Sequence, residues 1–534
     1  MDAVRERTRR IQRGLGDLWS PIFGGFGRVT PIQAEAMPVL LDRRDAVLTS
    51  PTASGKSEAA LAPAIRDLID NGGEGAGLLW VIPTRALVAD MDRRFRDLLG
   101  SLGVPAAFRT SDRAHLPAVP PRALFTTPES LDSLLCRRRD LFKNSVRTVV
   151  LDELHLLDGT PRGDQLRVLL RRLVGDHLRA PPHRVILSAT VADPPALAAR
   201  YIGDAVICTS GRARAIDFAL AGDLDDAIKQ CRAAKRHKVL VFCNSRRDCE
   251  RLAREADEQR LWPRDRISVH HGSLAAALRR EVEAGLREAR VALCFATMTL
   301  EIGVDIGDLD AIILHEAPPT REAFYQRVGR GCRREDRIFS VGIAAGPMEA
   351  AVFEEYLAPE DAITITPTPP DLSVVVQQLL SMVFAAPRGR SVEDLHERVE
   401  PLCSPAQFSA ITDHLVSQGL LRSAGRGRLA AGETVMDMGE KGTIHTNIDE
   451  PRTAQVVDQA TGKPLGEVSW DPRRGGTVVL GGRSWAVSEG RRGQLVARAA
   501  GTDAGVAAFA PRRSRGRFAR FLPPELLAPS SKPT

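Results

Sequence analysis

Short apolar runs alternate with amphipathic stretches twice between residues 30 and 360. The first series contains AVLTS, LLWVIP, RTVVLDE and RVILSAT, and the second contains KVLVFCNS, RISVHHG, VALCFAT and DAIILHE. Helical material follows each run, which is typical of parallel strands joined by crossover helices. The segment 208–218, CTSGRARAIDF, separates the two series as a linker. We therefore expect two α/β halves in tandem, with ligand chemistry at the carboxyl ends of their strands.

The residues after the Pro-rich stretch 364–372 show a different pattern. Three helical segments precede LLRSAGRGRLAAG, which predicts a two-stranded wing, a design used both in nucleic-acid binding and in packing. From about residue 443 the pattern is β, and Gly481-Gly482 between apolar runs signals a hairpin. The predicted domains are two parallel-sheet lobes, a winged helix, a small β-barrel and a flexible tail, at residues 1–210, 211–366, 367–435, 436–520 and 521–534.

Charge and cysteine content restrict the class of protein. The 74 Lys and Arg against 67 Asp and Glu give a formal net charge of +7, which suits a polyanionic partner without requiring one. The eight cysteines never form a Cys-x-x-Cys pair, so we expect reduced thiols rather than a zinc or iron–sulfur site. The charged amino terminus lacks a signal-peptide core, and no apolar run is long enough to span a membrane. A cytoplasmic protein is expected.

The stretch TSPTASGKSEAA at residues 49–60 ends like a phosphate-binding loop, although most of the usual glycines are missing. Such a loop needs small side chains, free backbone N–H groups, a helix amino terminus, a cation and a hydroxyl for Mg²⁺. Gly55 gives backbone freedom, Lys56 is placed for the β- and γ-phosphates, and Ser57 for the metal. Ser50 stands where the usual first glycine is found and is small enough. The loop also lies between an apolar run and a helical one, as it must.

Two adjacent carboxylates, Asp152 and Glu153, follow the apolar run TVVL. At a strand end they suit metal binding and the orientation of an attacking water, although a solvated acidic turn has the same composition. An arginine aimed at a γ-phosphate from a neighbouring domain stabilises the charge that develops in hydrolysis, whereas a solvent-exposed basic face is the ordinary alternative. The motif QRVGRGCR provides such candidates at helical spacing: Gln326, Arg327, Arg330 and Arg333. Because all these signals occur in one order and at strand ends, the sequence predicts a working nucleotide pocket.

This ordered set of motifs resembles that of a superfamily 2 helicase. The resemblance covers residues 29–335. In the first half it rests on TPIQAEA (motif Q), SPTASGKS (I), PTRAL (Ia), TTPES (Ib), DELH (II) and SAT (III). In the second half it rests on VFCNSRR (IV), ATMTLEIGVDIG (V) and QRVGRGCR (VI). Within the superfamily, DELHLLDGTPRG and TLEIGVDIG are most similar to the Lhr (large helicase-related) group, and similarity extends to about residue 510. The resemblance implies two RecA-like domains, a winged helix and a small β-barrel.

The resemblance also implies roles at the ATP site, with ATP and Mg²⁺ as cofactors. The implied catalytic residues are Lys56, Asp152, Glu153, Gln326, Arg330 and Arg333. The implied ATP-binding residues are Thr30, Gln33, Thr52, Ala53, Ser54, Gly55, Lys56, Ser57, Gly303 and Asp305. Ser57 and Asp152 are the implied metal ligands. Coupling of ATP state to lobe closure is assigned to His155, Ser188 and Thr190.

The nucleic-acid contacts implied by the resemblance are grips on successive phosphates. The residues are Thr84, Arg85, Thr127, Ser245, Arg246 and Thr297. Such contacts position a strand and carry no sequence information. Alternating grips on the two lobes, driven by ATP, then imply stepping along one strand.

The chain departs from the family in and before motif VI. At 331–332 the sequence reads Gly-Cys where relatives usually have Ala-Gly, so a thiol is expected near the ATP. Only about twenty residues separate Asp305 from Gln326, which leaves no room for a long strand-separating hairpin. The winged helix and the barrel aromatics Trp470 and Trp485 are the remaining candidates, although a half-buried barrel residue is the simpler interpretation of each tryptophan.

Two further features of the sequence are a basic stretch near the carboxyl terminus and a pair of histidines. The basic stretch RRSRGRFARF near the carboxyl terminus is either an extra phosphate contact or a tail docked on the body. The pair His270-His271 has no third residue spaced as a metal ligand, so a strand-end turn is expected there.

The resemblance implies a motor that hydrolyses ATP, moves 3′ to 5′ along single-stranded DNA and unwinds DNA or RNA–DNA duplexes in DNA repair. Its expected partner is single-stranded DNA or a tailed duplex. One alternative is an RNA helicase, because many of the implied contacts are with phosphates. The other alternative is a nucleic-acid-dependent ATPase clamp that binds without unwinding.

Overall fold

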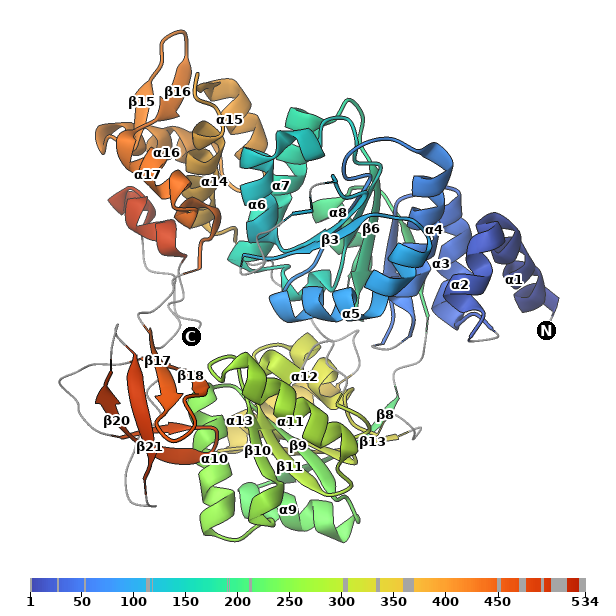
Figure 1. The fold of residues 1–534 in the computed structure, drawn as a ribbon, viewed down its shortest axis with the longest axis vertical. Coiled ribbons are helices and arrows are strands. Elements are labelled where there is room, and N and C mark those ends of the chain that lie inside the picture. The colour runs from blue at the N-terminus through green and yellow to red at the C-terminus, as the bar shows by residue number, and fades with distance from the viewer. Residues whose placement is uncertain are drawn as a thin grey trace. The chain divides into compact units, whose positions relative to one another are not determined.

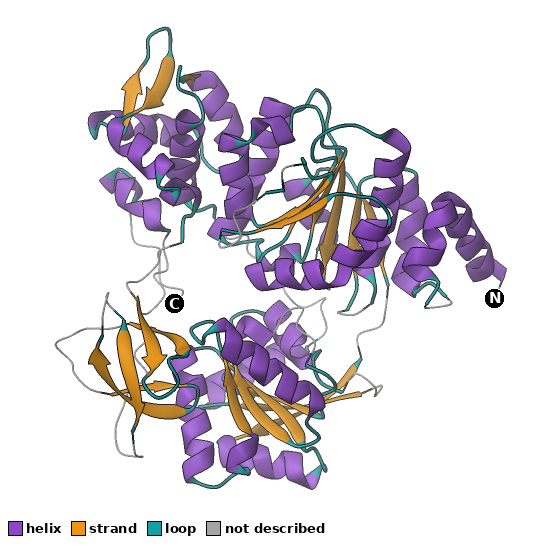
Figure 2. Ribbon diagram, viewed as in Figure 1, coloured by secondary structure: helices purple, strands orange, loops and turns teal. Residues whose placement is uncertain are grey.

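The computed structural model divides the chain into two compact units, each built around a parallel β-sheet (Figure 1; Figure 2). Unit 1 comprises residues 1–211, 364–449 and 513–534, and unit 2 comprises residues 212–363 and 450–512. The winged-helix region therefore belongs with the first lobe, and the C-terminal β region with the second. The residues that the structure describes are 2–25, 28–51, 54–111, 116–117, 119–189, 191, 193–210, 214–300, 306–332, 337–358, 369–448, 453–469, 477–490, 494–500 and 516–527.

The first lobe is built on a seven-stranded sheet in the order β3-β4-β2-β5-β6-β1-β7, with every pairing parallel. The strands are β1 Ala46–Thr49, β2 Leu78–Val81, β3 Ala106–Arg109, β4 Ala123–Thr126, β5 Thr148–Leu151, β6 His183–Ser188 and β7 Val206–Thr209. All four residues are buried in each of β1, β2, β4 and β5, as expected of strands covered on both faces. The short apolar runs of the sequence are these strands.

Helices precede the first strand of this lobe and connect most of the later ones (Figure 2). They are α1 Asp2–Leu15, α2 Trp19–Phe23, α3 Pro31–Leu41, α4 Lys56–Asn71, α5 Arg85–Ser101, α6 Pro128–Arg137, α7 Pro161–His177 and α8 Pro194–Tyr201, with the 3-10 turns η1 Gly16–Leu18, η2 Arg139–Leu141 and η3 Leu154–Leu156. Several begin at a hydroxyl or carboxylate N-cap, which accepts a backbone N–H of the first helical turn, and Thr127, the N-cap of α6, directly follows β4.

The second lobe has a six-stranded sheet in the order β10-β11-β9-β12-β13-β8, again entirely parallel. Its strands are β8 Ala215–Ala221, β9 Lys238–Cys243, β10 Ile267–His270, β11 Ala292–Ala296, β12 Ala311–His315 and β13 Arg337–Ile343. Its helical segments are α9 Leu224–Ala233, α10 Arg246–Glu258, η4 Arg264–Arg266, α11 Ala276–Glu288, η5 Met298–Leu300, α12 Arg321–Val328 and α13 Pro347–Leu357. The prediction of two tandem α/β halves is confirmed.

A helical domain with a three-stranded wing completes most of unit 1. Its elements, in chain order, are α14 Leu372–Phe384, β14 Arg390–Ser391, α15 Val392–Val399, α16 Pro405–Ser417, β15 Leu421–Ser423 and β16 Arg428–Ala431. The helix α14 is buried along nearly its whole length, in a core that also takes in Val168 of the first lobe. This order of helices and wing strands is that of a winged helix.

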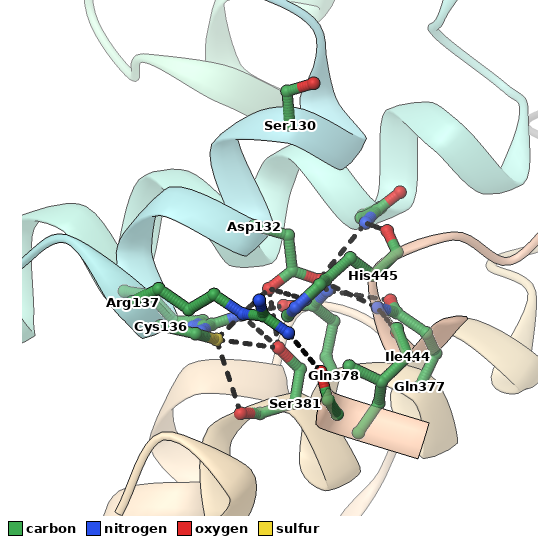
Figure 3. A network of polar contacts seen from close by, with 12 residues as sticks. Ser130, Asp132, Cys136, Arg137, Gln377, Gln378, Ser381, Ile444 and His445 are labelled. Atoms are coloured by element: carbon green, nitrogen blue, oxygen red, sulfur yellow. Dashed lines mark hydrogen bonds and ion pairs between the residues drawn. The ribbon is translucent and has the colours of Figure 1, made fainter. Parts of the chain in front are cut away.

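A buried polar network joins the winged helix to the first lobe (Figure 3). The Asp132 carboxylate of α6 is fully buried and accepts hydrogen bonds from Arg172 Nη1 at 2.6 Å, Ser381 Oγ at 2.6 Å, Gln377 Nε2 at 2.8 Å and Gln378 Nε2 at 2.9 Å. Three of these donors lie on α14. Burial alone would raise the pKa of Asp132, but the Arg172 guanidinium and the other donors hold that pKa well below its ordinary value. The network fixes α14 on α6 and α7.

The structure places two segments differently from the predicted domain boundaries. Residues 436–445, expected in the barrel, lie in α17 Glu433–Glu440 and η7 Thr443–His445, which pack in the winged-helix core. Residues 516–527, expected at the end of the barrel and in a flexible tail, form η10 Arg517–Phe521 and η11 Pro524–Leu526. The buried side chain of Phe518 joins the same core, and the Phe518 backbone N–H donates to Asn447 Oδ1 at 3.0 Å. The apolar residues within this basic stretch therefore dock on the body; residues 528–534 lie outside the described part.

The described residues 453–469, 477–490 and 494–499 of unit 2 form a curled five-stranded sheet, here called the β-module. Its strands are β17 Thr453–Asp458, β18 Pro464–Ser469, β19 Thr477–Leu480, β20 Arg483–Glu489 and β21 Leu495–Ala499, in the order β18-β17-β21-β20-β19. The sheet is mixed rather than antiparallel throughout, because β17 and β21 pair in parallel. The Gly481-Gly482 turn joins β19 to β20, as predicted. Trp485 is buried in its core and donates to Leu480 O at 2.9 Å, whereas Trp470 lies outside the described residues.

Across the described residues, no helix has both the length and the apolar character needed to cross a membrane. All eight cysteines are described, and each is a free thiol.

Candidate nucleotide and nucleic-acid site

The phosphate loop lies between β1 and α4. Gly55 has φ +90° at the amino terminus of α4, and a Cβ there would come within 2.4 Å of Gln33 Nε2, so only glycine fits. Ser50, at the position of the usual first glycine, is buried, and its hydroxyl is 2.5 Å from that of Ser54. Thr52 and Ala53 lie outside the described residues. A serine pair thus takes the place of glycine in this loop.

Lys56 and Ser57 open helix α4, directly after the loop. The Lys56 ammonium donates to Ser50 O at 2.6 Å and to Pro51 O at 3.1 Å. Burial lowers the pKa of Lys56, and the nearby charges of Glu153 and Asp152 oppose that change. The lysine is therefore a buried cation that faces two carboxylates, while the Ser57 side chain is only half-buried.

The two carboxylates follow β5. Asp152 is 5% exposed, and its Oδ2 accepts a hydrogen bond from Trp80 Nε1 at 3.0 Å. Burial, and next the charge of Glu153, raises the pKa of Asp152 to about 7, although the Trp80 hydrogen bond pulls it down. Glu153 has φ +45°, a left-handed conformation that is uncommon for a residue with a Cβ. Backbone strain of this kind gathers at functional sites.

A polar contact joins the carboxylate turn to the next strand. His155 Nδ1 lies 3.1 Å from Ser188 Oγ, at the end of β6, and accepts a hydrogen bond from the Ala189 N–H at 3.1 Å. Because Nδ1 accepts from the backbone, the Ser188 hydroxyl must be the donor in the other contact. The strands β5, β6 and β1 are neighbours, so motifs II, III and I meet at one edge of the sheet. Thr190, the third predicted coupling residue, lies outside the described part.

Thr30 and Gln33 form a capping box at the start of α3. Gln33 Oε1 accepts from the Thr30 N–H at 2.9 Å, and Thr30 Oγ1 accepts from the Gln33 N–H at 3.4 Å. Gln33 Nε2 in turn donates to Gly55 O at 3.2 Å. Both ends of the Gln33 amide are thus bonded within the protein and tie α3 to the phosphate loop. Contact with adenine stays a prediction.

The predicted phosphate-gripping residues lie at the carboxyl ends of strands in each lobe. Thr84, Thr127 and Ser245 are the N-caps of α5, α6 and α10, and each side-chain oxygen accepts a backbone N–H of the first helical turn. Arg85 is the first residue of α5, and buried Thr297 follows β11. A helix amino terminus offers free N–H groups to a phosphate, so these positions suit a strand's backbone.

Arg246, the remaining predicted grip, contacts another part of the second lobe. It is the first residue of α10, and its guanidinium donates to Ser273 Oγ. Its place beside Ser245 fits a phosphate contact, and its bond to Ser273 adds a structural role that the sequence did not indicate.

Motif VI forms α12 and the turn after it. Gln326 and Arg330 are buried, at 6% and 3% exposure. Arg327 donates to Asn244 Oδ1 at 2.8 Å and lies over the Phe242 ring, which is a structural role. Gly303, Asp305 and Arg333 lie outside the described residues, so their roles stay predictions.

The thiol of motif VI is turned into the second lobe. Cys332 is buried with φ +49°, and its Sγ donates to Asp310 O at 3.1 Å. The Phe339 N–H lies 3.4 Å from the same sulfur. Since both contacts lie within the second-lobe core, this thiol has a packing role.

Sequence reasoning missed Trp80 and Asn244. Trp80 orients Asp152 from 72 positions away, and Asn244 holds Arg327 from 83 positions away. No motif spacing connects such pairs; only the adjacency of strands β2 and β5, and of β9 and β12, brings them together.

One group of metal-ligand residue types occurs among the described side chains: Asp132, Cys136 and His445. A cation already lies there, because Arg172 Nη1 is 2.6 Å from Asp132 Oδ1 and Arg172 Nη2 is 3.3 Å from Cys136 Sγ. Burial also raises the pKa of the Cys136 thiol, which disfavours the thiolate that a metal needs. The cluster is a protein-filled network and holds no metal in our interpretation.

Two family models match the chain. The DEAD/DEAH box helicase model matches residues 30–197, and the helicase conserved C-terminal domain model matches residues 222–335. Together they span just over half of the chain, and each falls within one of the two parallel-sheet lobes.

Curated relatives carry the Lhr name. The "Lhr helicase/probable uracil glycosylase" of Mycolicibacterium smegmatis is 31% identical over 374 residues, which are 57% of this chain and 25% of the relative. The "ATP-dependent helicase Lhr-Core protein 2" of Thermococcus barophilus is 29% identical over 68% of this chain and 47% of the relative. The chain thus spans a quarter to about half of the length of these relatives.

Solved structures of helicases are also similar to this chain. The Mycobacterium smegmatis helicase Lhr, bound to ssDNA and AMP-PNP, is 27% identical with a TM-score of 0.68, and the match covers 82% of this chain and 63% of that one. The DUF1998 helicase MrfA, bound to DNA, has a TM-score of 0.70 over 94% of this chain and 74% of that one. At 20% identity, the second likeness concerns the fold alone.

Proposed function

Since this chain belongs to the DEAD/DEAH box helicases of superfamily 2 and is similar to the Lhr proteins, we propose that it hydrolyses ATP to move along single-stranded nucleic acid. The matched domains are those of helicase ATPases. The observation that carries the proposal is the meeting of Lys56, Asp152 and Ser188 at the carboxyl ends of three neighbouring strands. A buried lysine at a helix amino terminus, facing two carboxylates, is an arrangement built for a polyphosphate and its counter-ion.

The residues of the loop fit ATP together with Mg²⁺. Residues 52–57 would cradle the phosphates, with Lys56 at the β- and γ-phosphates. The Ser57 hydroxyl and the Asp152 carboxylate are the oxygen ligands that Mg²⁺ prefers. Burial and the charge of Glu153 raise the pKa of Asp152, and a bound cation would oppose that change. The metal would neutralise charge that develops on the phosphates, while Glu153 orients the attacking water.

The second lobe would supply the groups that complete hydrolysis. Arg330 and Arg333 are the proposed fingers, with Gln326 near the γ-phosphate and Gly303 and Asp305 facing the nucleotide. Arg330 is 3% exposed, and as a finger its guanidinium would have to approach the γ-phosphate directly. The contacts of His155 with Ser188 and Ala189 would pass the ATP state to lobe closure, together with Thr190.

We propose DNA as the track and 3′ to 5′ as the direction. Support comes from the similar Mycobacterium smegmatis Lhr, whose solved structure contains ssDNA. The helix amino termini capped by Thr84, Thr127 and Ser245, with Arg85, Arg246 and Thr297, would hold the strand by its phosphates. A phosphate grip leaves RNA as the second candidate track, since it does not read the sugar.

Unwinding of DNA or RNA–DNA duplexes, and a role in DNA repair, complete the proposal. The winged helix and the β-module are the candidates for strand separation; burial of Trp485 in the module core leaves that indole without a stacking role. A clamp that hydrolyses ATP without unwinding is the alternative outcome.

The test is steady-state ATP hydrolysis by the full chain, alone and with single-stranded DNA or RNA of matched sequence. Strong stimulation by DNA, absent from a Lys56→Ala control, is the expected result, followed by displacement of a strand from a 3′-tailed duplex but not a 5′-tailed one. Equal or greater stimulation by RNA would transfer the proposal to the RNA helicase. Hydrolysis without displacement would leave the clamp, and no stimulation would overturn the proposal.

A further inference from the structure

The β-module is built onto the second lobe through the segment that follows β10. Leu274 of this segment forms an antiparallel bridge with Gly466 of β18. The Ala275 N–H donates to Leu465 O at 2.9 Å, and the Glu467 N–H donates to Ser273 O at 2.7 Å. Leu274 is 4% exposed and belongs to the core of the module. The second lobe therefore adds a short edge and a core side chain to the curled sheet.

A buried carboxylate makes the second attachment. Glu250 of α10 is fully buried, and its Oε1 and Oε2 accept the backbone N–H groups of Gly481 at 2.7 Å and Gly482 at 2.5 Å. His271 Nε2, also fully buried, lies 2.8 Å from Glu250 Oε1. A buried carboxylate is costly unless donors surround it, and here two of its donors belong to the β19–β20 turn. The turn and the carboxylate therefore stabilise each other.

The same segment contacts the motor motifs. His270, one residue before His271, places Nδ1 2.9 Å from Thr299 Oγ1 in motif V, and Thr299 Oγ1 donates to His270 O at 3.2 Å. Ser273 accepts from Arg246 of motif IV. His270, the last residue of β10, therefore contacts motif V, and the next residue, His271, contacts the Glu250 carboxylate that holds the module. Motifs IV and V and the β-module thus share one short segment of the second lobe.

We propose that Glu250 is a positioning residue that fixes the β19–β20 turn to the second lobe, so that the β-module moves with motifs IV and V as one body during the ATP cycle. This inference rests on the proposed motor function. Without Glu250 the module keeps its bridge at Leu274 and can rotate about it. The ATP site is intact in that state, but the module no longer follows the movement of the second lobe. ATP hydrolysis then continues while strand displacement is lost.

The test variant is Glu250→Gln, which keeps the size and shape of the side chain. Its amide oxygen can still accept the hydrogen bonds from the Gly481 N–H and from His271. Its NH₂ group, however, faces the Gly482 N–H, so that a hydrogen bond is replaced by a contact between two donors. The matched control is Glu258→Gln, on the exposed end of the same helix. We expect DNA-stimulated ATP hydrolysis within about 2-fold of the parent in both variants, and at least about a 10-fold loss of base pairs unwound per ATP in Glu250→Gln alone.

A reversible cross-link separates positioning from a general folding defect. A Cβ on Gly482 would lie 3.7 Å from Ala253 Cβ, which is within the usual Cβ–Cβ range of a disulfide. Because Gly482 has φ +72°, which strains any side chain, the same two cysteines with Glu250 kept are the reference for unwinding. In the Glu250→Gln background, Ala253→Cys with Gly482→Cys should regain unwinding on oxidation and lose it on reduction, with bond formation checked by thiol counting. If the bond forms and unwinding stays low, or if Glu250→Gln unwinds as well as the parent, the proposal is overturned.

Hydrogen exchange gives a readout that does not depend on activity. Amides of residues 477–489 should exchange at least about 10-fold faster in Glu250→Gln than in the parent or in Glu258→Gln, because the turn loses its anchor. If the parent neither hydrolyses ATP nor unwinds, the motor function fails, whereas unchanged exchange in Glu250→Gln would show that the anchor itself is absent.

Discussion

The indole Nε1 of Trp80 donates a hydrogen bond to Oδ2 of Asp152 at 3.0 Å, across the neighbouring strands β2 and β5. The indole thereby fixes one carboxylate oxygen of the proposed metal ligand. It also pulls the pKa of Asp152 down, against burial and the charge of Glu153, which raise it. An aromatic residue in the middle of a strand thus acts on the chemistry of motif II.

Trp80→Phe removes this donor and keeps most of the packing. We expect ATP turnover to fall about 10-fold, because the loss of a hydrogen bond to the buried Asp152 carboxylate costs about 1–3 kcal/mol. Steady-state hydrolysis at saturating ATP is the measurement. Trp262→Phe is the matched control, since the Trp262 indole N–H has no hydrogen-bond partner among the described residues. Equal losses in the two variants would contradict a role for the Trp80–Asp152 bond.

Glu153→Gln tests the proposed water-orienting residue. The amide keeps the shape of the side chain but cannot take up a proton, so we expect turnover to fall by about 10²–10⁴-fold while ATP still binds. Binding is measured with a fluorescent ATP analogue and turnover by phosphate release. The control is Glu281→Gln, at an exposed position of α11 in the second lobe. Retained turnover in Glu153→Gln would remove this residue from the catalytic set.

Arg330→Ala tests the second lobe. An arginine finger contributes about 10³–10⁵-fold to hydrolysis, so a loss of that order is expected. Arg280→Ala, on the exposed surface of α11, is the control. Circular dichroism of both variants checks that the buried position tolerates the change. A loss below 10-fold, roughly, in a folded variant would assign Arg330 to packing instead.

The sequence predicted those parts of the molecule that local patterns encode. The buried strands β1 and β5 follow from the apolar runs in AVLTS and RTVVLDE, each of which ends in polar residues. The two parallel sheets follow from the alternation of such runs with helices, and the comparisons bear out the family that the motifs indicated. The roles of the site residues remain predictions for the experiments above.

Contacts between distant segments could not be predicted in this way. Glu250 lies in an ordinary amphipathic helix, and its partner Gly482 is 232 positions away. Phe518 stands in a basic stretch for which the sequence left a phosphate contact and docking on the body equally open, and its side chain fills the winged-helix core. Leu274 completes a sheet from another part of the chain. In each case, the residue is buried by a segment that lies far away in the sequence, so the local hydrophobic periodicity does not predict its burial.

Asp132→Asn should destabilise unit 1. The asparagine leaves the buried Arg172 guanidinium without its counter-charge, which costs about 3–5 kcal/mol when one partner of a buried pair is removed. Thermal unfolding of the full chain, with tryptophan fluorescence as the probe, should show a lower first transition. Asp140→Asn, an exposed residue paired with Arg138, is the control and should leave that transition in place. Added EDTA should not mimic Asp132→Asn, because Arg172 rather than a metal neutralises the carboxylate.

The stability of the first lobe should also depend on pH through His177, at the end of α7. Burial lowers the pKa of His177 to about 4, although Asp176 opposes the change. Between that value and an ordinary histidine pKa of about 6.5, the unfolded chain binds a proton that the folded chain does not. The contribution is therefore fully present above about pH 6.5 and is lost as the pH falls toward 4, by at most about 1.4 kcal/mol per pH unit.

The His177→Phe variant removes this proton site and keeps an aromatic ring against Phe142. Its melting temperature should fall less than that of the parent between pH 7 and pH 4.5, roughly, while the two proteins keep a constant difference above pH 7. His237→Gln, at an exposed position, should retain the parent's dependence. If His177→Phe and the parent lose stability in parallel on acidification, the proton uptake of the unfolded chain occurs at other residues, and burial of His177 does not set the acid limit of this lobe.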